Sequence, residues 1–302
     1  MSVTLPEVRV GEPVRFAGLS VFPLFSESTS SAAYRLSDEA IADRSVVVEE
    51  VSQSGSVPEL FVENKGDVRV LFLEGELLVG AKQNRVLNTS ILVRAKTKVK
   101  IPVSCVEQGR WRYRSAAFGH SGYHSPSKLR YALKRSVTAS TREDGTHRSD
   151  QGEVWSHVAK YLCAHAVSST TGALDEVFET KRKQVAEFRT KATYAPGATG
   201  MAVAVGGRVV AVDVFDKPST CEKVWDRMLS GCLLDVTQAD SEAEAADKSA
   251  VERLLKSAQQ ATWKQIQSVG EGEEHRAQVG EDHASVLSLQ GTVVHGSVLA
   301  RS

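Results

Sequence analysis

The chain has 302 residues, 41% hydrophobic and 25% charged, a composition typical of a globular protein large enough to bury a substantial core. Lys plus Arg and Asp plus Glu each number 37, so no overall charge favours a polyanionic partner. No stretch approaches the roughly 20 apolar residues that cross a bilayer, and the first residues lack the apolar run of a secretory signal. We therefore expect no membrane segment.

The first third of the chain is rich in β-branched residues separated by short polar segments. Strands are expected at 14–24 and 45–51, with a short helix between them that has Ser37 as its N-cap. Four more strands are expected at 68–73, 76–80, 85–93 and 98–106. The short separations, which carry Gly or charged residues, predict consecutive antiparallel pairing of these four strands.

Residues 112–150 are rich in Ser, Gly, Arg, Tyr and His, which predicts a long loop with helix only at 128–137. Its polar section 139–151 is expected to be mobile. Apolar residues at helical spacing then predict an amphipathic helix at 152–166, with Asp150 capping its start.

The second half of the chain mixes helices and strands. Gly206 and Gly207 supply the positive φ that a tight hairpin turn needs. The predicted elements are a helix at 174–191, a hairpin at 200–215, helices at 219–234 and about 242–268, and strands at 284–291 and 292–300.

Many antiparallel strands with helices in separate runs predict an α+β fold. We expect a mainly antiparallel β-sheet or sandwich core with several packed helices. The chain shows no internal repeat, so a single domain is expected over 1–302. Its motif core covers 14–236, and a helix and closing β-hairpin follow at 242–300.

Polar residues bunch between the strands of the first third, where binding and catalytic sites usually lie. Gln83, Asn84 and Arg85 offer amide and guanidinium donors near Glu76, and Asn88 follows on the same segment. A planar guanidinium suits phosphate or carboxylate, and amides can contact hydroxyl or amide edges. Because alternate residues of a strand share a face, the favoured set is Gln83, Arg85 and Glu76. The alternative is a hairpin turn with a solvated, charged loop.

A second polar group lies where the strand at 98–106 ends. Cys105 would be a nucleophile only if a nearby cation lowered its pKa, and it is otherwise a small core residue. Glu107 is either a carboxylate of the site or half of a structural ion pair with Arg110. Trp111 either caps the core or stacks on a planar base or sugar.

A third wall of the site is expected from Ser169 and Thr170, whose hydroxyls lie in a turn before a helix and would help to hold an anion. The alternative is an ordinary connection between helices with capping hydroxyls. Between Arg110 and Ser149, basic residues outnumber acidic ones nine to two and are interleaved with aromatic residues. That pattern suits nucleic acid, but the chain is neutral overall and shows no known binding module, so a small phosphorylated ligand is favoured.

Metal and cofactor motifs are not found in the sequence. The eight histidines form no H-x-H or H-E-x-x-H arrangement, and the four cysteines form no C-x-x-C. Phosphate-loop, dinucleotide-binding and G-x-S-x-G motifs are also absent from the sequence, so we expect neither a metal nor a cofactor. Widely spaced cysteines are typical of reduced thiols in a cytoplasmic protein.

Several separated motifs resemble one known domain family. They are LFLEGELLVGAKQNRVLNTSILV, IPVSCVEQGRW, SDQGEVWSHV, SSTTGALDEVFE and GMAVAVGGRVVAVDVFDKP, in this order over roughly residues 14–236. The family is named for its association with ADP-ribosylglycohydrolases and rhodanese-type phosphatases. The resemblance implies an α+β domain of unproven biochemical role, linked by its neighbours to ADP-ribose or related nucleotide phosphates.

Together these observations lead to one hypothesis and one alternative. The hypothesis is binding, with or without hydrolytic processing, of a small nucleotide-derived anion such as ADP-ribose. Arg85 and Arg110 would bind phosphate or carboxylate, Gln83 and Asn88 would fix orientation, and Trp111 would stack. A metal-independent hydrolase or transferase would use Glu76 or Glu107 as general base, with Cys105 as a candidate nucleophile. The alternative is a non-catalytic interaction or scaffold domain whose polar cluster is a structural network.

Overall fold

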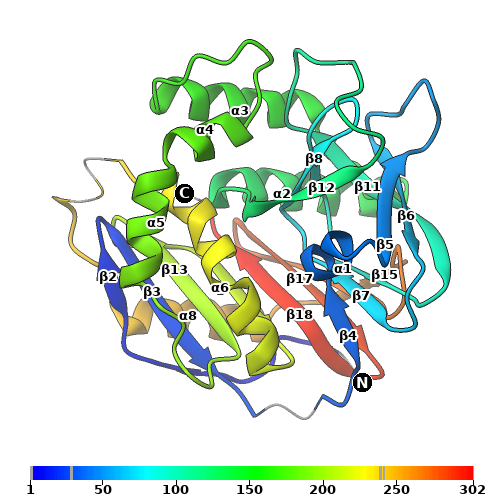
Figure 1. Ribbon diagram of the computed structural model, residues 1–302. Helices are drawn as coiled ribbons and strands as arrows, with labels where there is room; N and C mark the ends of the chain where they lie inside the picture. Colours follow the sequence, from blue (N-terminus) through cyan, green and yellow to red (C-terminus); the bar gives the residue numbers. More distant parts are fainter. Residues whose placement is uncertain (1–2, 28–29, 238–239, 241, 302) are drawn as a thin grey trace.

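The computed structural model describes residues 3–27, 30–237, 240 and 242–301, and its strands form three mostly antiparallel sheets with helices packed against them (Figure 1). This arrangement confirms the predicted α+β class. A helix with the length and apolarity of a membrane span does not occur within the described ranges.

The largest sheet has nine strands in the order β1-β3-β13-β14-β18-β17-β16-β15, with β2 paired to β3, and every pair is antiparallel. Its strands are β1 (Arg9–Val10), β2 (Val14–Phe16), β3 (Leu19–Phe25), β13 (Gly200–Val205), β14 (Arg208–Phe215), β15 (Lys264–Ile266), β16 (Glu273–Val279), β17 (Asp282–Leu289) and β18 (Thr292–Leu299). The hairpin predicted between β13 and β14 is confirmed, and Gly206 and Gly207 both have positive φ.

Helices cover both faces of this sheet. For this reason its central strands carry apolar side chains on both faces instead of alternating between apolar and polar residues. The helices α5 (Arg182–Lys191) and α6 (Pro218–Leu233) pack on the face that carries Val21, and α8 (Lys248–Gln259) packs on the face that carries Phe22 (Figure 1). The amphipathic pattern predicted α6 at almost its observed position.

Two smaller sheets stand beside the large one. One has the order β10-β7-β4 and the other β12-β8-β9-β11-β6-β5. Their strands are β4 (Tyr34–Leu36), β5 (Val46–Glu50), β6 (Glu59–Asn64), β7 (Arg69–Phe72), β8 (Glu76–Gly80), β9 (Arg85–Leu87), β10 (Ile91–Val93), β11 (Thr97–Cys105) and β12 (Phe118–His124). The short helix α1 (Ser37–Ala42) contributes Ala40 to the apolar core that these sheets share.

A layer of helices covers β8 and β9. It consists of α2 (Ser127–Glu143), α3 (Gln151–Ala164) and α4 (Asp175–Thr180), which bury Leu129, Val154 and Phe178 against Leu77 and Val86. The predicted cap of α3 is confirmed, because the Asp150 side chain accepts a hydrogen bond from the Glu153 amide.

The prediction of consecutive antiparallel pairing at 68–106 was only partly right. Strands β8, β9 and β11 do pair in succession, but β7 pairs with β10 and, in parallel, with β4. The strand predicted at 85–93 is divided at Asn88–Ser90 into β9 and β10, which belong to different sheets. Local sequence could not show this, because the partner strands decide where each strand ends.

Other boundaries also differ from the prediction because distant contacts fix them. The 112–150 segment contains the strand β12, which pairs with β8, and a helix α2 that continues to Glu143. In the section expected to be mobile, the His147 carbonyl accepts a hydrogen bond from Asn88 Nδ2 at 2.9 Å. Ser37 is the first helical residue of α1 rather than its N-cap, and its hydroxyl donates to Glu76.

The helices near the C-terminal end are shorter than predicted. Instead of covering 242–268, α8 begins after Asp247, whose side chain accepts from the Ala250 amide, and the chain turns into β15 after the helix ends. The helix predicted at 174–191 is interrupted at Lys181, which separates α4 from α5. The strand β16 was not predicted, because its sequence Glu-Glu-His-Arg-Ala-Gln-Val is too polar to indicate a buried strand.

Gly231 allows α6 to approach β12 closely. A Cβ atom there would lie 2.5 Å from the carbonyl oxygens of both His124 and Ser125. We expect Gly231→Ala to lower the free energy of unfolding by about 1–3 kcal/mol, because backbone atoms must move to make room. Urea denaturation would measure this. Gly152→Ala, at an exposed position of α3, is the control and should be neutral or slightly stabilising. If both variants lost the same free energy of unfolding, close packing at Gly231 would not be the cause.

Candidate functional site

The two polar segments that the sequence singled out lie together in the structure. The backbone amide of Asn84 donates to Glu107 Oε2 at 2.9 Å, and Arg110 Nη2 donates to the side-chain oxygen Oδ1 of Asn84 at 3.1 Å. The contact follows from the sheet, because β9 and β11 are antiparallel neighbours and Arg85 is opposite Cys105 in their register. Residues 83–85 and 105–110 therefore form one cluster.

Arg110 and Glu107 are the tightly bound part of this cluster. The guanidinium donates from Nε to Glu107 Oε1 at 2.7 Å and from Nη2 to Oε2 at 2.6 Å. It also donates to the carbonyl oxygens of Gly80 and Ala81. Burial opposes ionisation of Glu107, but the hydrogen bonds from Arg110 and from the Asn84 amide outweigh it and lower the pKa of Glu107. This pair is compensated and rigid.

The predicted third wall does reach the cluster, through a residue that was not predicted. Thr171 Oγ1 donates to Glu107 Oε1 at 3.0 Å, and the Gly109 amide donates to the Thr171 carbonyl at 2.7 Å. Ser169 uses its hydroxyl within its own turn, where it accepts from the Ala173 amide, and Thr170 is exposed. The turn geometry decides which of these hydroxyls contacts Glu107, and it is that of Thr171.

Arg85 is held much more loosely, although its side chain is 0% exposed. Its contacts are long: 3.2 Å from Nη1 to Gln83 Oε1, and 3.5 Å from Nη2 to the Ser56 carbonyl. The Glu50 carboxylate is 3.9 Å away without a hydrogen bond, and Arg85 Nε has no hydrogen-bond partner among the described residues. Burial therefore lowers the pKa of Arg85.

Two exposed aromatic rings lie near this part of the cluster, Trp111 beside the Arg85 guanidinium and Tyr113 beside Lys82. Trp111 is 46% exposed and Tyr113 is 50% exposed. Lys82 Nζ lies 5.2 Å from the Trp111 ring centre and 5.1 Å from that of Tyr113, and the Arg85 guanidinium lies 5.8 Å from the Trp111 ring centre. We call these five residues, Lys82, Gln83, Arg85, Trp111 and Tyr113, the Arg85 corner. Lys82, Tyr113 and Glu50 were not among the predicted site residues.

Cys105 lies beneath the Arg85 corner as a buried thiol. Its Sγ donates to Gln83 Oε1 at 3.2 Å and to the Glu107 carbonyl at 3.3 Å. Burial raises the pKa of the Cys105 thiol, although the hydrogen bond that the Glu107 backbone amide donates to Sγ and the nearby Arg85 both oppose the rise. The thiol is thus protonated near neutral pH, which does not favour a nucleophile.

Glu76 and Asn88 contact other partners. Glu76 accepts from the Ser37 hydroxyl at 2.6 Å and from Arg227 at 3.0 Å, and burial raises its pKa to about 7. Asn88 accepts from the Ser104 hydroxyl at 2.6 Å and donates to the His147 carbonyl. Neither side chain has a described contact with the Arg85 corner.

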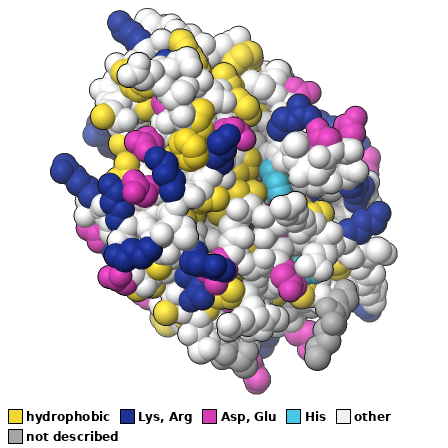
Figure 2. Space-filling view, turned by 90° about the vertical axis from the view of Figure 1, so that its right-hand side faces the viewer, with side chains coloured by type: hydrophobic (Ala, Val, Ile, Leu, Met, Phe, Trp, Pro, Cys, Tyr) yellow, Lys and Arg dark blue, Asp and Glu magenta, His cyan; other side chains and the backbone are white. Residues whose placement is uncertain are grey.

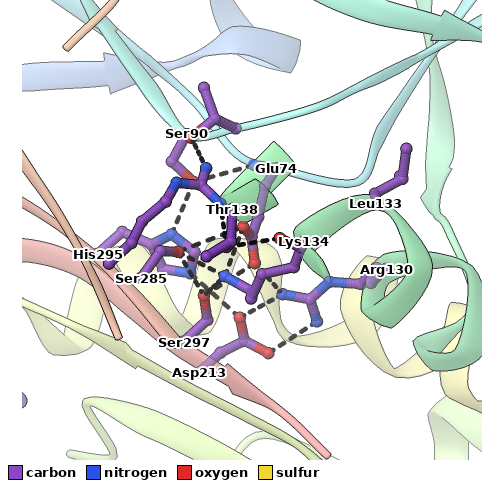
Figure 3. Close-up of polar contacts among 12 residues, drawn as sticks. Glu74, Ser90, Arg130, Leu133, Lys134, Thr138, Asp213, Ser285, His295 and Ser297 are labelled. Carbon is purple, nitrogen blue, oxygen red and sulfur yellow. Dashed lines mark hydrogen bonds and ion pairs between the residues drawn. The ribbon is translucent and has the colours of Figure 1, made fainter. Parts of the chain in front are cut away.

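A second polar cluster lies in the centre of the molecule and was not predicted. Arg130 and Lys134, one turn apart on α2, point toward two carboxylates from other elements, Glu74 and Asp213, with His295 beside them (Figure 3). Arg130 contacts Asp213 through both terminal nitrogens, at 2.9 and 2.7 Å, and contacts Glu74 at 3.2 Å.

The other ionisable side chains of this cluster, Lys134 and His295, also have partners. Lys134 Nζ donates to Glu74 Oε2 at 2.7 Å, and His295 Nε2 lies 3.1 Å from Asp213 Oδ1. The hydroxyls of Ser90, Ser285 and Ser297 complete the set, which we call the Glu74 network. Burial opposes ionisation of Glu74, but Lys134 and Arg130 lower its pKa, whereas burial lowers the pKa of Lys134 to about 8.

The Glu74 network is structural in character, because its charges compensate one another. The space beside it, between Glu74 and Leu133, has no volume that a water molecule could enter. Sequence spacing hardly indicated the network, since its residues come from segments up to 223 positions apart.

Comparison with known protein families identifies the family of this chain. A match to the ARG and Rhodanese-Phosphatase-superfamily-associated Protein domain covers residues 7–299. The chain belongs to this family. No match was found among curated proteins or among solved structures. The family match covers nearly the whole chain, beyond the 14–236 over which the motifs showed the resemblance, so the C-terminal strands are part of the family's domain.

The family's name records an association with ARG proteins and with the rhodanese-phosphatase superfamily. In this member of the family, no three His, Cys, Asp or Glu side chains within the described ranges are grouped so as to hold a metal ion. What the Arg85 corner offers instead is cationic and amide donors beneath exposed aromatic rings, a set suited to a planar anionic molecule.

Proposed function

We propose that this member of the ARG- and rhodanese-phosphatase-associated family binds a small nucleotide-derived anion, such as ADP-ribose or a related phosphate, at the Arg85 corner. The observation that carries the proposal is the incomplete pairing of Arg85. Arg110 and Arg130 each contact a carboxylate through short hydrogen bonds, whereas Arg85 is equally buried, donates only long hydrogen bonds to neutral oxygens of the described residues, and has the Glu50 carboxylate 3.9 Å away without a hydrogen bond. A buried donor without a good acceptor calls for a functional explanation.

A nucleotide-like ligand fits the chemistry of the corner. Because the Arg85 side chain is 0% exposed, binding requires the corner to open; the phosphate oxygens would then replace the weak contact between Arg85 and the Ser56 carbonyl and would accept from Lys82, whose Nζ now donates to the Ser54 carbonyl at 2.8 Å. Its base or sugar would stack on Trp111 or Tyr113. Figure 2 shows the side of the molecule that lies on the right in Figure 1, where β5 and β6 are, and there hydrophobic side chains lie among Lys, Arg, Asp and Glu.

Two further points are consistent with the proposal. If ARG in the family's name stands for ADP-ribosylglycohydrolase, the name connects the family with ADP-ribose. The four cysteines are all free thiols, which favours a cytoplasmic location. Turnover without a metal would use Glu107 or Glu76 as general base. Glu107 is already bound by Arg110, so binding is favoured over hydrolysis or transfer.

The deciding experiment compares Arg85→Met with the wild type by thermal shift and calorimetry, using ADP-ribose, AMP, ribose 5-phosphate and inorganic phosphate. We expect ADP-ribose to raise the melting temperature of the wild type, and Arg85→Met to weaken its affinity at least tenfold. Arg208→Met, which removes an exposed arginine at the start of β14, is the control and should bind as the wild type does.

The stability of Arg85→Met separates the proposal from the alternative scaffold role. Since the ion pair between Arg85 and Glu50 is long and has no hydrogen bond, methionine should cost less than the roughly 3 kcal/mol expected when a tightly hydrogen-bonded buried partner is removed. A loss of about 3 kcal/mol or more, together with no ligand response in the wild type, would favour a structural network. The scaffold role has an observation of its own in its favour, which is the complete pairing of Arg110 and Glu107 in the same cluster.

A further inference from the structure

A separate cavity of about 870 Å³ opens between the helices, with part of its wall formed by α2. It is bounded by α2, α3, the junction of α4 and α5, the C-terminal end of α6, and Arg301. None of its lining residues belongs to the Arg85 corner or to the Glu74 network. Its volume is within the range of about 300–1,000 Å³ that small-molecule sites occupy.

Cations from separate elements converge on this cavity. Lys128 comes from α2, Lys160 from α3 and Lys181 from the α4–α5 junction. None of the ion pairs found among the described residues involves these three lysines, although Lys128 is close enough to Asp235 and Asp240 to favour their ionised forms. Like charges that converge without a partner repel one another, so the arrangement favours an anion between them.

The two acidic groups of the cavity are hydrogen-bonded to partners other than these lysines, although Lys128 favours the ionised form of Asp235. Glu153 is engaged by Arg135, with both carboxylate oxygens in contact with the guanidinium at 2.6 and 2.7 Å. Asp235 accepts from the amide and hydroxyl of Ser127, both at 2.7 Å, and from the Tyr161 hydroxyl. Both carboxylates are thus committed to the protein itself.

The histidines of the cavity show the same positive environment. Burial and the neighbouring Lys160 lower the pKa of His157. Burial also lowers the pKa of His165, with Lys181 adding to the effect, although a hydrogen bond to the Leu234 carbonyl opposes it. Both rings are therefore neutral at pH 7 and do not add to the charge of the lysines; the His165 N–H is used by the Leu234 carbonyl, which leaves His157 as the ring that can donate to a ligand.

The floor of the cavity gives it a second, apolar character. Leu233, Leu234 and Val236 line it beside Tyr131, whose hydroxyl donates to the Glu281 carbonyl. A bare inorganic anion would leave this apolar surface uncovered, whereas a phosphorylated organic molecule would cover it. We infer that this cavity is a second binding site, for a phosphate-bearing small molecule of nucleotide size, independent of the Arg85 corner.

Isothermal titration calorimetry of the full chain with ADP tests the inference. Lys128→Ala/Lys160→Ala/Lys181→Ala removes the cavity's lysines, and Lys183→Ala/Lys256→Ala/Lys264→Ala removes three exposed lysines that lie outside it. If both sites bind ADP, the wild type takes up two molecules per chain. The cavity triple variant should then retain one, Arg85→Met should retain one, and the control triple variant should retain both.

The outcomes separate the two proposals. Binding that survives Arg85→Met but falls at least tenfold in the cavity variant supports the second site, even if the Arg85 corner binds nothing. Binding that is lost in Arg85→Met alone, or that weakens equally in both triple variants, overturns it. Should the cavity variant fail to fold, the ring signals of His157 and His165 in the wild type can be followed by NMR during the ADP titration. Saturable shifts of both support the site, and unchanged signals overturn it.

Discussion

Arg130→Met is expected to lower the free energy of unfolding by about 3–5 kcal/mol, because removal of one partner leaves a buried charge without compensation. Arg130 joins both carboxylates of the Glu74 network, contacting Asp213 at 2.7 Å and Glu74 at 3.2 Å. Without it, Lys134 is the one cation left hydrogen-bonded to these two buried carboxylates in the part of the chain that the structure describes. Urea denaturation at pH 7 would measure the loss.

The same helix supplies a matched control. Arg135 is also on α2, but its side chain is 47% exposed and it pairs with Glu153 at the surface. We expect Arg135→Met to cost less than about 1 kcal/mol, since exposed ion pairs contribute little. If Arg130→Met were as mild as Arg135→Met, the buried network would not be a main determinant of stability.

Glu76→Gln is expected to stabilise the protein relative to the wild type as the pH rises. The pKa of Glu76 is raised from about 4.5 in the unfolded chain to about 7 in the folded protein, chiefly by burial. Arg227 opposes this shift, but the same guanidinium also pairs with Asp38 at 2.6 Å. The folded state therefore keeps a proton on Glu76 that the unfolded state releases.

The sign of the effect follows from this difference in proton binding. The contribution of Glu76 is fully favourable below pH 4.5 and is lost as the pH rises through 7, by up to about 3 kcal/mol at about 1.4 kcal/mol per pH unit. Glutamine cannot ionise, so the variant should match the wild type near pH 5 and exceed it at pH 8. Denaturation curves at pH 5, 6, 7 and 8 would show this, and parallel pH profiles would mean that Glu76 ionises normally.

Much of the fold was predictable because it depends on local patterns. The amphipathic stripe of α6, the Asp150 cap and the paired glycines of the β13–β14 hairpin all act within a few residues. The divided strand at Asn88–Ser90 and the polar strand β16 were not predictable in this way. Their conformations depend on partner strands that lie far away in the sequence.

The candidate site shows the same limit. The sequence brought Gln83, Arg85 and Glu107 to attention because polar residues clustered at strand ends, and the structure brings them together. The sequence could not show that Glu76 contacts Arg227 instead of the Arg85 corner. The Glu74 network was missed for a different reason: buried lysine and arginine on α2 look like surface charges until the helix is packed against a sheet.

The strand order of the large sheet has a consequence for how the protein is made. Strands β17 and β18 come last among the described strands, yet they lie in the interior of the sheet, with β18 between β14 and β17. A nascent chain that has released β13 and β14 from the ribosome still exposes the open edge of β14. It must remain incompletely folded until some 80 further residues have emerged, and during that interval the open edge invites pairing with other chains.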